Sequence, residues 1–172
     1  PERWFWGPSR VLAETPGVEG QAITEMPAFT FVYGDMHAHM ISMPLMIFAI
    51  GFVLNEILLA GRETRRAGWR WIALAIGAIT IGLFRAVNTW EWPTFTALGL
   101  LGLGYVWWLR WRRISRWSLL DLVLTNGGLM VIGYFAARPF TQWYASTYSS
   151  VKLWDGNQTP LWAYLDIHGL FL

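Results

Sequence analysis

The sequence contains no cysteine, which excludes a disulfide framework, thiol chemistry and thiolate metal sites. Charged residues are also scarce: Asp, Glu, Lys and Arg make up 14% of the 172 residues, against about 25% in soluble domains. What the chain has instead is a hydrophobic content of 55% and 13 tryptophans, and tryptophan is typical of membrane–water interfaces. We therefore predict an all-α integral membrane protein.

Four apolar runs approach the roughly 20 residues that a helix needs to cross a bilayer. They are Met40–Leu59, Trp71–Val87, Thr94–Leu109 and Ser118–Ala137, and Leu161–Leu172 resembles the start of a fifth. The chain begins at Pro1 without a signal-peptide pattern and ends inside an apolar run. We therefore expect a fragment of a larger polytopic protein.

Arginines cluster in two short segments, residues 61–70 and 110–116, which connect the first run to the second and the third to the fourth. Short Arg-rich loops stay in the cytoplasm, so these clusters indicate a topology in the plasma membrane and not a nucleic-acid partner. The predicted organisation is an extracytoplasmic segment with short interfacial pieces (1–39), a four-helix transmembrane region (40–137), an extracytoplasmic loop (138–160) and the start of a fifth helix (161–172). Membrane lipids are the expected partners.

The densest polar motif, Asp35-x-His37-x-His39, directly precedes the first apolar run, and Glu25 lies ten residues before Asp35. In an extended chain its three side chains point the same way, whereas in a helix only Asp35 and His39 share a face. Carboxylate and imidazole suit a divalent metal ion, and a carboxylate can also orient an imidazole for acid–base chemistry. The alternative is a pair of interfacial histidines that bind headgroups or loop backbone.

A second candidate is Glu91, which stands between Trp90 and Trp92 in the connection before the third run. The tryptophans could stack a sugar, or they could belong to an aromatic belt. An acid this close to hydrocarbon usually needs a partner. Arg85 is one candidate for that partner, and the alternative is that its guanidinium reaches the membrane surface.

Several residues carry structural expectations. Pro44 is expected in the first turn of its helix, where its missing N–H is not needed. Ser118 is expected to cap the fourth helix, which Arg138-Pro139 should close. Asp121 should interact with the positive first turn of that helix. Small residues should allow close helix contact, and they are Gly99, Gly102, Gly104, Gly127 and Gly128.

Four stretches together resemble one family, and they are Phe5–Val11, Ile23–Leu45, Asn88–Phe95 and Tyr164–Leu172. The family is that of the YYY membrane proteins, large polytopic proteins of Chloroflexi and archaea with a domain of unknown function. That family is in turn similar to type C glycosyltransferases, which use lipid-phosphate-linked sugars. The likeness to glycosyltransferases is one of fold and does not by itself establish chemistry.

The resemblance implies an enzyme that transfers sugar at the extracytoplasmic face. Asp35, Glu25 or Glu91 would act as base or metal ligand, and His37 and His39 would bind a divalent metal or the donor phosphate. Arg138 and Arg10 would meet phosphate, and Trp90 and Trp92 would stack the sugar. The alternative is a Trp-rich scaffold subunit of a photosynthetic or respiratory membrane complex, in which His37 or His39 contacts a tetrapyrrole pigment.

Overall fold

The computed structural model describes residues 31, 34, 36–61, 67–111, 113–144, 153 and 160–169. Within these ranges every regular element is a helix: α3 (Ala38–Leu59), α4 (Ala67–Val87), α5 (Trp92–Trp111), α6 (Arg116–Trp143) and α7 (Leu161–His168). Helices α3 to α6 belong to one compact unit, Ala38–Ser146, and α7 belongs to a second. The predicted all-α class is confirmed, and each of the five predicted apolar segments contains a helix.

Three of the helices are long and apolar enough to cross a membrane, over Ala38–Leu59, Gly68–Val87 and Arg116–Trp143. Two helices lie outside this group: α7, which has only 8 residues, and α5, which is 20 residues long but rich in tryptophan and glycine. Tryptophan and glycine contribute little to mean hydropathy. Of the four predicted spans, three therefore meet the requirement of length and apolar composition. Nevertheless α5 lies inside the bundle, where it packs against α3, α4 and α6.

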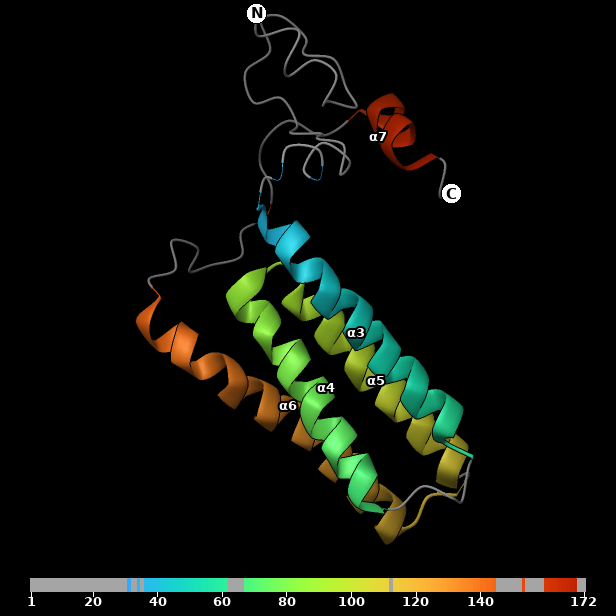
Figure 1. The fold of residues 1–172 in the computed structure, drawn as a ribbon. Coiled ribbons are helices and arrows are strands. Elements are labelled where there is room, and N and C mark those ends of the chain that lie inside the picture. Colours follow the sequence, from blue (N-terminus) through green and yellow to red (C-terminus); the bar gives the residue numbers. More distant parts are fainter. Residues whose placement is uncertain are drawn as a thin grey trace, which may run out of the picture. The chain divides into compact units, whose positions relative to one another are not determined.

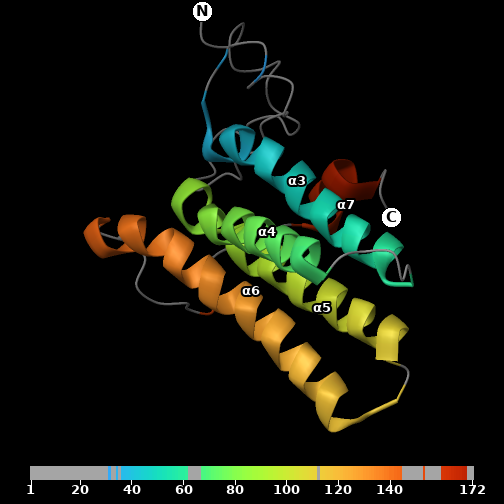
Figure 2. The same ribbon diagram turned by 60° about the horizontal axis from the view of Figure 1, so that its bottom comes forward.

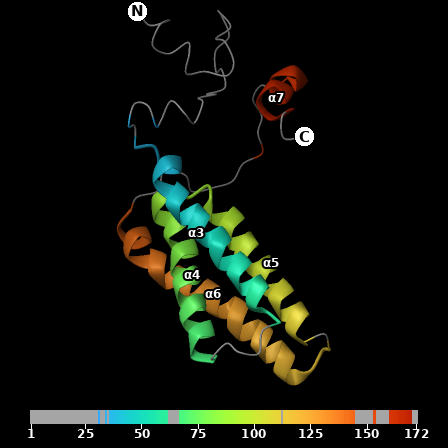
Figure 3. The same cartoon turned by 45° about the vertical axis from the view of Figure 1, so that its right-hand side comes forward.

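The four helices alternate in direction (Figure 1). Helices α4 and α5 contact each other, and both contact α3 and α6 (Figures 1 and 3). One end of the bundle contains the start of α3, the α4–α5 connection and the end of α6, and we call it the Glu91 end. The opposite end contains the end of α3, the start of α4, the end of α5 and the start of α6, and we call it the arginine end (Figure 1). The described arginines of this end are Arg70, Arg110, Arg113 and Arg116.

The core lies between the four helices and is formed by side chains from α3, α4, α5 and α6. Its buried members include Phe52, Leu74, Ile81, Phe84, Phe95, Leu103 and Leu129. Phe84 and Phe95 stack with their ring centroids 4.5 Å apart, which joins α4 to α5 close to the Glu91 end. Large apolar side chains are also exposed along the outside of all four helices, which is the surface expected in contact with lipid chains.

Helix α6 crosses α4 where Gly82 meets Gly133, and it separates from α4 toward its C-terminal end (Figures 1 and 2). A Cβ atom on Gly82 would lie 2.7 Å from the Gly133 Cα atom, so no side chain fits between the two backbones.

The expected close contacts of two glycines in α5 are confirmed. Side chains of Ile81 and Leu129 lie against Gly99, and the side chain of Val53 lies against Gly102. The expectation for Gly104 and Gly127 is wrong, since open space surrounds both.

The ends of two helices differ from the prediction. Helix α3 begins at Ala38, so Pro44 lies beyond its first turn, where it leaves the Met40 carbonyl without its helical donor. Helix α6 continues through Pro139 to Trp143, because a proline near a helix end removes only one backbone hydrogen bond. The cap of α6 is Ser115 and not Ser118; the two serines form a reciprocal capping box.

Candidate functional site

The Glu91 end is built on a four-residue connection between α4 and α5. The Asn88 N–H donates to the Phe84 carbonyl at 2.8 Å and so extends the last turn of α4. The Glu91 N–H donates to the Asn88 carbonyl at 3.0 Å, and the Glu91 carbonyl accepts from the Phe95 N–H at 3.0 Å. These bonds place Glu91 directly before the first turn of α5, where the partial positive charge of a helix favours a carboxylate.

The two carboxylate oxygens of Glu91 have different surroundings. Oε1 accepts a hydrogen bond of 2.8 Å from the side-chain amide of Asn88. Oε2 is buried and has no hydrogen-bond partner within the described ranges. A buried acceptor without a partner is costly, so Oε2 is a position where a cation or a hydrogen-bond donor of a ligand would be stabilised.

Arg85 is not the partner of Glu91. Its guanidinium carbon lies 4.8 Å from the centroid of the Trp92 ring, over the ring face. The partner of Glu91 is Asn88, three residues away, where a side-chain amide reaches the carboxylate without bending the connection. Of the two alternatives that the sequence left open for Arg85, an ion pair with Glu91 is therefore not observed.

The two tryptophans beside Glu91 differ in exposure. Trp90 is 78% exposed at the tip of the connection, whereas Trp92 is half-buried and packs against the core. Only Trp90 is exposed enough to offer its ring to a ligand or to headgroups. The ring of Trp92 instead contacts the guanidinium of Arg85.

The motif Asp35-x-His37-x-His39 is described in part. His37 precedes α3 and is half-buried, and His39 lies exposed in the first turn of α3. The hydroxyl of Ser42 donates to the His39 carbonyl at 2.9 Å, which ties that turn together. Asp35, Glu25 and Arg10 lie outside the described residues. Among the residues that are described, His, Asp and Glu form no group of three able to hold a metal ion, and the predicted metal site stays a prediction.

Arg138 is exposed on the last turns of α6. Its guanidinium carbon lies 5.9 Å from the Phe135 ring centroid. With its amide oxygen turned to the guanidinium, Gln142 accepts from Nε at 2.9 Å and from Nη2 at 3.2 Å. Two N–H donors of Arg138 are therefore already hydrogen-bonded within α6.

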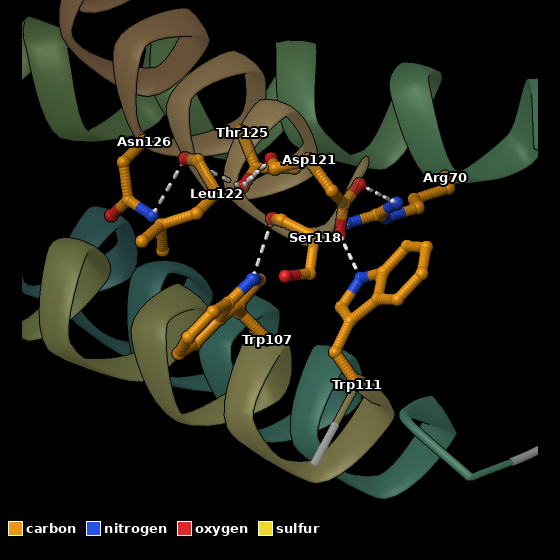
Figure 4. Close-up of polar contacts among 8 residues, drawn as sticks. All are labelled: Arg70, Trp107, Trp111, Ser118, Asp121, Leu122, Thr125 and Asn126. Carbon is orange, nitrogen blue, oxygen red and sulfur yellow. Dashed lines mark hydrogen bonds and ion pairs between the residues drawn. The ribbon is translucent and has the colours of Figure 1, made fainter. Parts of the chain in front are cut away.

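A polar cluster at the arginine end joins three helices (Figure 4). Arg70 of α4 forms a bidentate ion pair with Asp121 of α6, with bonds of 2.6 and 3.0 Å, and the two side chains are only 15% and 12% exposed. The Trp111 indole of α5 donates to Asp121 at 3.0 Å, and the Trp107 indole donates to the Ser118 carbonyl at 2.6 Å. This cluster fixes α6 against α4 and α5.

Sequence reasoning assigned Asp121 only to the helix dipole and missed the ion pair. The available signal was a carboxylate inside an apolar run, because such a group usually needs a charged partner. The choice of Arg70 among the many arginines of that end depends on helix packing. The cluster has the geometry of a structural contact, since every charge in it is paired internally.

Tryptophans gather at both ends of the bundle. The arginine end contains Trp69, Trp71, Trp107, Trp108, Trp111 and Trp117, and the Glu91 end contains Trp90, Trp92 and Trp143. Apolar helices between two tryptophan-rich ends are the arrangement of a helical membrane protein. The chain belongs to the family of uncharacterized membrane proteins designated DUF2298, whose family model matches residues 1–172. No curated protein and no solved structure matches the sequence.

Proposed function

We propose that this protein is a membrane glycosyltransferase-like enzyme that uses a lipid-phosphate-linked sugar at the Glu91 end. The observation that supports the proposal most is the Glu91 carboxylate, with Oε1 held by Asn88 and Oε2 buried without a partner in the described part of the chain. A general base needs this combination of a fixed orientation and an oxygen still able to accept a proton.

In the proposed orientation the arginine end faces the cytoplasm and the Glu91 end faces outward, across the plasma membrane. The Arg-rich connections support this orientation through the positive-inside rule. Helix α5 is proposed as a fourth span, because it is as long as a bilayer core requires and packs along three other spanning helices. A lipid-linked donor would then present its phosphate and sugar at the outer surface.

In the reaction, Oε2 of Glu91 takes the proton from an acceptor hydroxyl. The hydroxyl oxygen forms a bond to the anomeric carbon of the sugar, and the bond from that carbon to the lipid phosphate breaks. The lipid phosphate leaves with the bonding electron pair, so atoms and charge balance. Trp90, whose ring is exposed, would stack the sugar at this end.

The other predicted site residues have proposed roles that rest on the sequence analysis. His37 and His39, with Asp35, would hold a divalent metal ion or the donor phosphate, and Glu25 is a second candidate base. Arg10 and Arg138 would meet phosphate. Because Gln142 occupies two donors of Arg138, Arg138 would have to exchange that contact to bind a ligand.

The test is a transfer assay with the intact membrane protein and a polyprenyl-phosphate sugar. Glu91→Gln keeps the shape of the side chain and removes the base, so the rate should fall by about 10²–10⁴-fold. Asp166→Asn is the matched control, because it neutralises an exposed carboxylate on α7 and should leave the rate unchanged. A Glu91→Gln protein that transfers sugar at the wild-type rate would exclude Glu91 as the base.

A non-catalytic scaffold subunit is the second candidate. It is favoured by the exposed aromatic side chains near the end of α6, which are Tyr134, Phe135, Trp143 and Tyr144. Such a surface fits lipid chains or another membrane subunit of a photosynthetic or respiratory complex. An absorption spectrum of the purified protein with a stoichiometric tetrapyrrole, together with no consumption of lipid-linked sugar, would favour this role.

A further inference from the structure

Arg85 occupies an unusual electrostatic position at the Glu91 end. It lies in the last turn of α4, it is half-buried, and its guanidinium covers the face of Trp92 at 4.8 Å from the ring centroid. The only acid nearby in sequence, Glu91, is held by Asn88 instead. Within the described ranges no carboxylate forms an ion pair with Arg85.

Other arginines of the bundle show how this one differs. Arg70 is neutralised by Asp121 through two short bonds, and Arg138 donates to Gln142. Arg116 also stacks on a tryptophan, Trp117, at 5.2 Å, but it is exposed at the arginine end. Arg85 alone among these four combines partial burial with no polar side-chain partner in the described residues.

A guanidinium has five N–H donors arranged in a planar fork. The contact with Trp92 is with an aromatic ring and not with a hydrogen-bond acceptor, so it leaves the N–H donors able to bind a ligand. A half-buried cation without a counter-charge is costly at the edge of a membrane. The fork matches the oxygens of a phosphate group, to which it binds through two parallel hydrogen bonds.

We propose that Arg85 binds the phosphate group of a lipid at the Glu91 end, beside the proposed base. This deepens the proposed function and rests on it for the identity of the site. The headgroup level of the bilayer is where lipid phosphates are concentrated, and Arg85 ends a helix that is long and apolar enough to reach that level. Asn88 follows Arg85 by one turn and holds Glu91, so a lipid phosphate on Arg85 would lie close to the proton acceptor.

The experiment measures binding by the intact purified protein in a neutral detergent, using native mass spectrometry and titration calorimetry. The probes are a polyprenyl monophosphate, phosphatidylglycerol and inorganic phosphate, each added alone. Arg85→Gln should weaken binding of the phosphate lipid by about 10- to 100-fold, as expected for loss of charge-assisted hydrogen bonds. Arg85→Lys keeps the charge without the fork and should bind with intermediate affinity.

Arg116→Gln is the matched control, because it removes one positive charge and one arginine–tryptophan stack from the opposite end. It should bind the phosphate lipid within about twofold of wild type, since no lost bond is expected. Equal weakening in Arg116→Gln and Arg85→Gln would overturn the inference, because binding would then follow total charge. Wild-type affinity in Arg85→Gln would overturn it directly. If Arg85→Gln does not fold, the affinity of Arg85→Lys for the phosphate lipid is compared with that of Arg116→Lys. Weaker binding in Arg85→Lys alone supports the inference, and equal affinity in the two variants overturns it.

The three probes separate the possible sources of the phosphate. Arg85-dependent binding of the polyprenyl monophosphate supports both this inference and the proposed enzyme. Arg85-dependent binding of phosphatidylglycerol alone supports the lipid-phosphate site and argues against a lipid-linked sugar donor. Arg85-dependent binding of inorganic phosphate alone overturns the lipid part. Loss of transfer in Glu91→Gln together with Arg85-independent binding would leave the proposed function standing and refute this inference.

Discussion

Replacing Gly82 by alanine should destabilise the bundle, although alanine is the better helix former. At the α4–α6 crossing the added Cβ would lie 2.7 Å from Gly133 Cα and 2.8 Å from its carbonyl carbon. Both are backbone atoms, so no side-chain rotation relieves the overlap. The Gly133 carbonyl oxygen would lie closer still, so the two helices must separate by at least about 0.7 Å to restore ordinary contact, and a gap of that size forfeits about a quarter to a half of each van der Waals contact it opens.

The magnitude follows from two opposing contributions. Overpacking of a tight contact costs about 1–3 kcal/mol, and a rigid backbone contact belongs at the upper end of that range. Alanine recovers about 1 kcal/mol of helix propensity. The expected net loss in the free energy of unfolding is about 2 kcal/mol. Gly133→Ala should be milder, because its nearest neighbour, the Ala78 carbonyl oxygen, would be 3.2 Å away.

The assay is unfolding of the intact protein in mixed micelles by increasing denaturing detergent, followed by circular dichroism. Gly104→Ala is the control, since nothing lies within 4 Å of its added Cβ. It makes the same substitution inside a helix and should stabilise by up to about 1 kcal/mol. The reasoning is refuted if Gly82→Ala is as stable as wild type, or if the two variants shift stability in the same direction by the same amount.

Two further predictions concern the ion pair at the arginine end and the membrane topology. Arg70→Gln and Asp121→Asn should each lower the free energy of unfolding by about 2–3 kcal/mol, since each leaves the other charge largely buried. The double variant should lose less than the sum of the two, and strict additivity in the same unfolding assay would mean that the ion pair contributes nothing. A membrane-impermeant thiol reagent applied outside cells should label Thr89→Cys but not Ile114→Cys, because the Arg-rich connection is retained in the cytoplasm, and the reverse pattern would invert the proposed topology.

Sequence patterns alone located the five helices that the structure describes. The apolar runs at α3, α4 and α6 are as long as a bilayer core, and length and composition are local properties that any window of sequence contains. The tryptophan-flanked Glu91 was recognisable as a candidate for the same reason, because its neighbours in sequence are also its neighbours in space. Helix ends were less accurate: Ser115 and Ser118 are both good caps three residues apart, and only backbone geometry selects between them.

Contacts between helices were decided by the tertiary structure. Arg70 and Asp121 are 51 residues apart, and the rotation of α4 and α6 about their axes selects this pair from many arginines. The same packing brings Gly82 against Gly133 and leaves Gly104 in open space, although all three are glycines in apolar helices. Arg85 lies over Trp92 and forms no ion pair with Glu91, whose Oε1 is held by Asn88. Such choices depend on how helix surfaces fit together, which local periodicity does not encode.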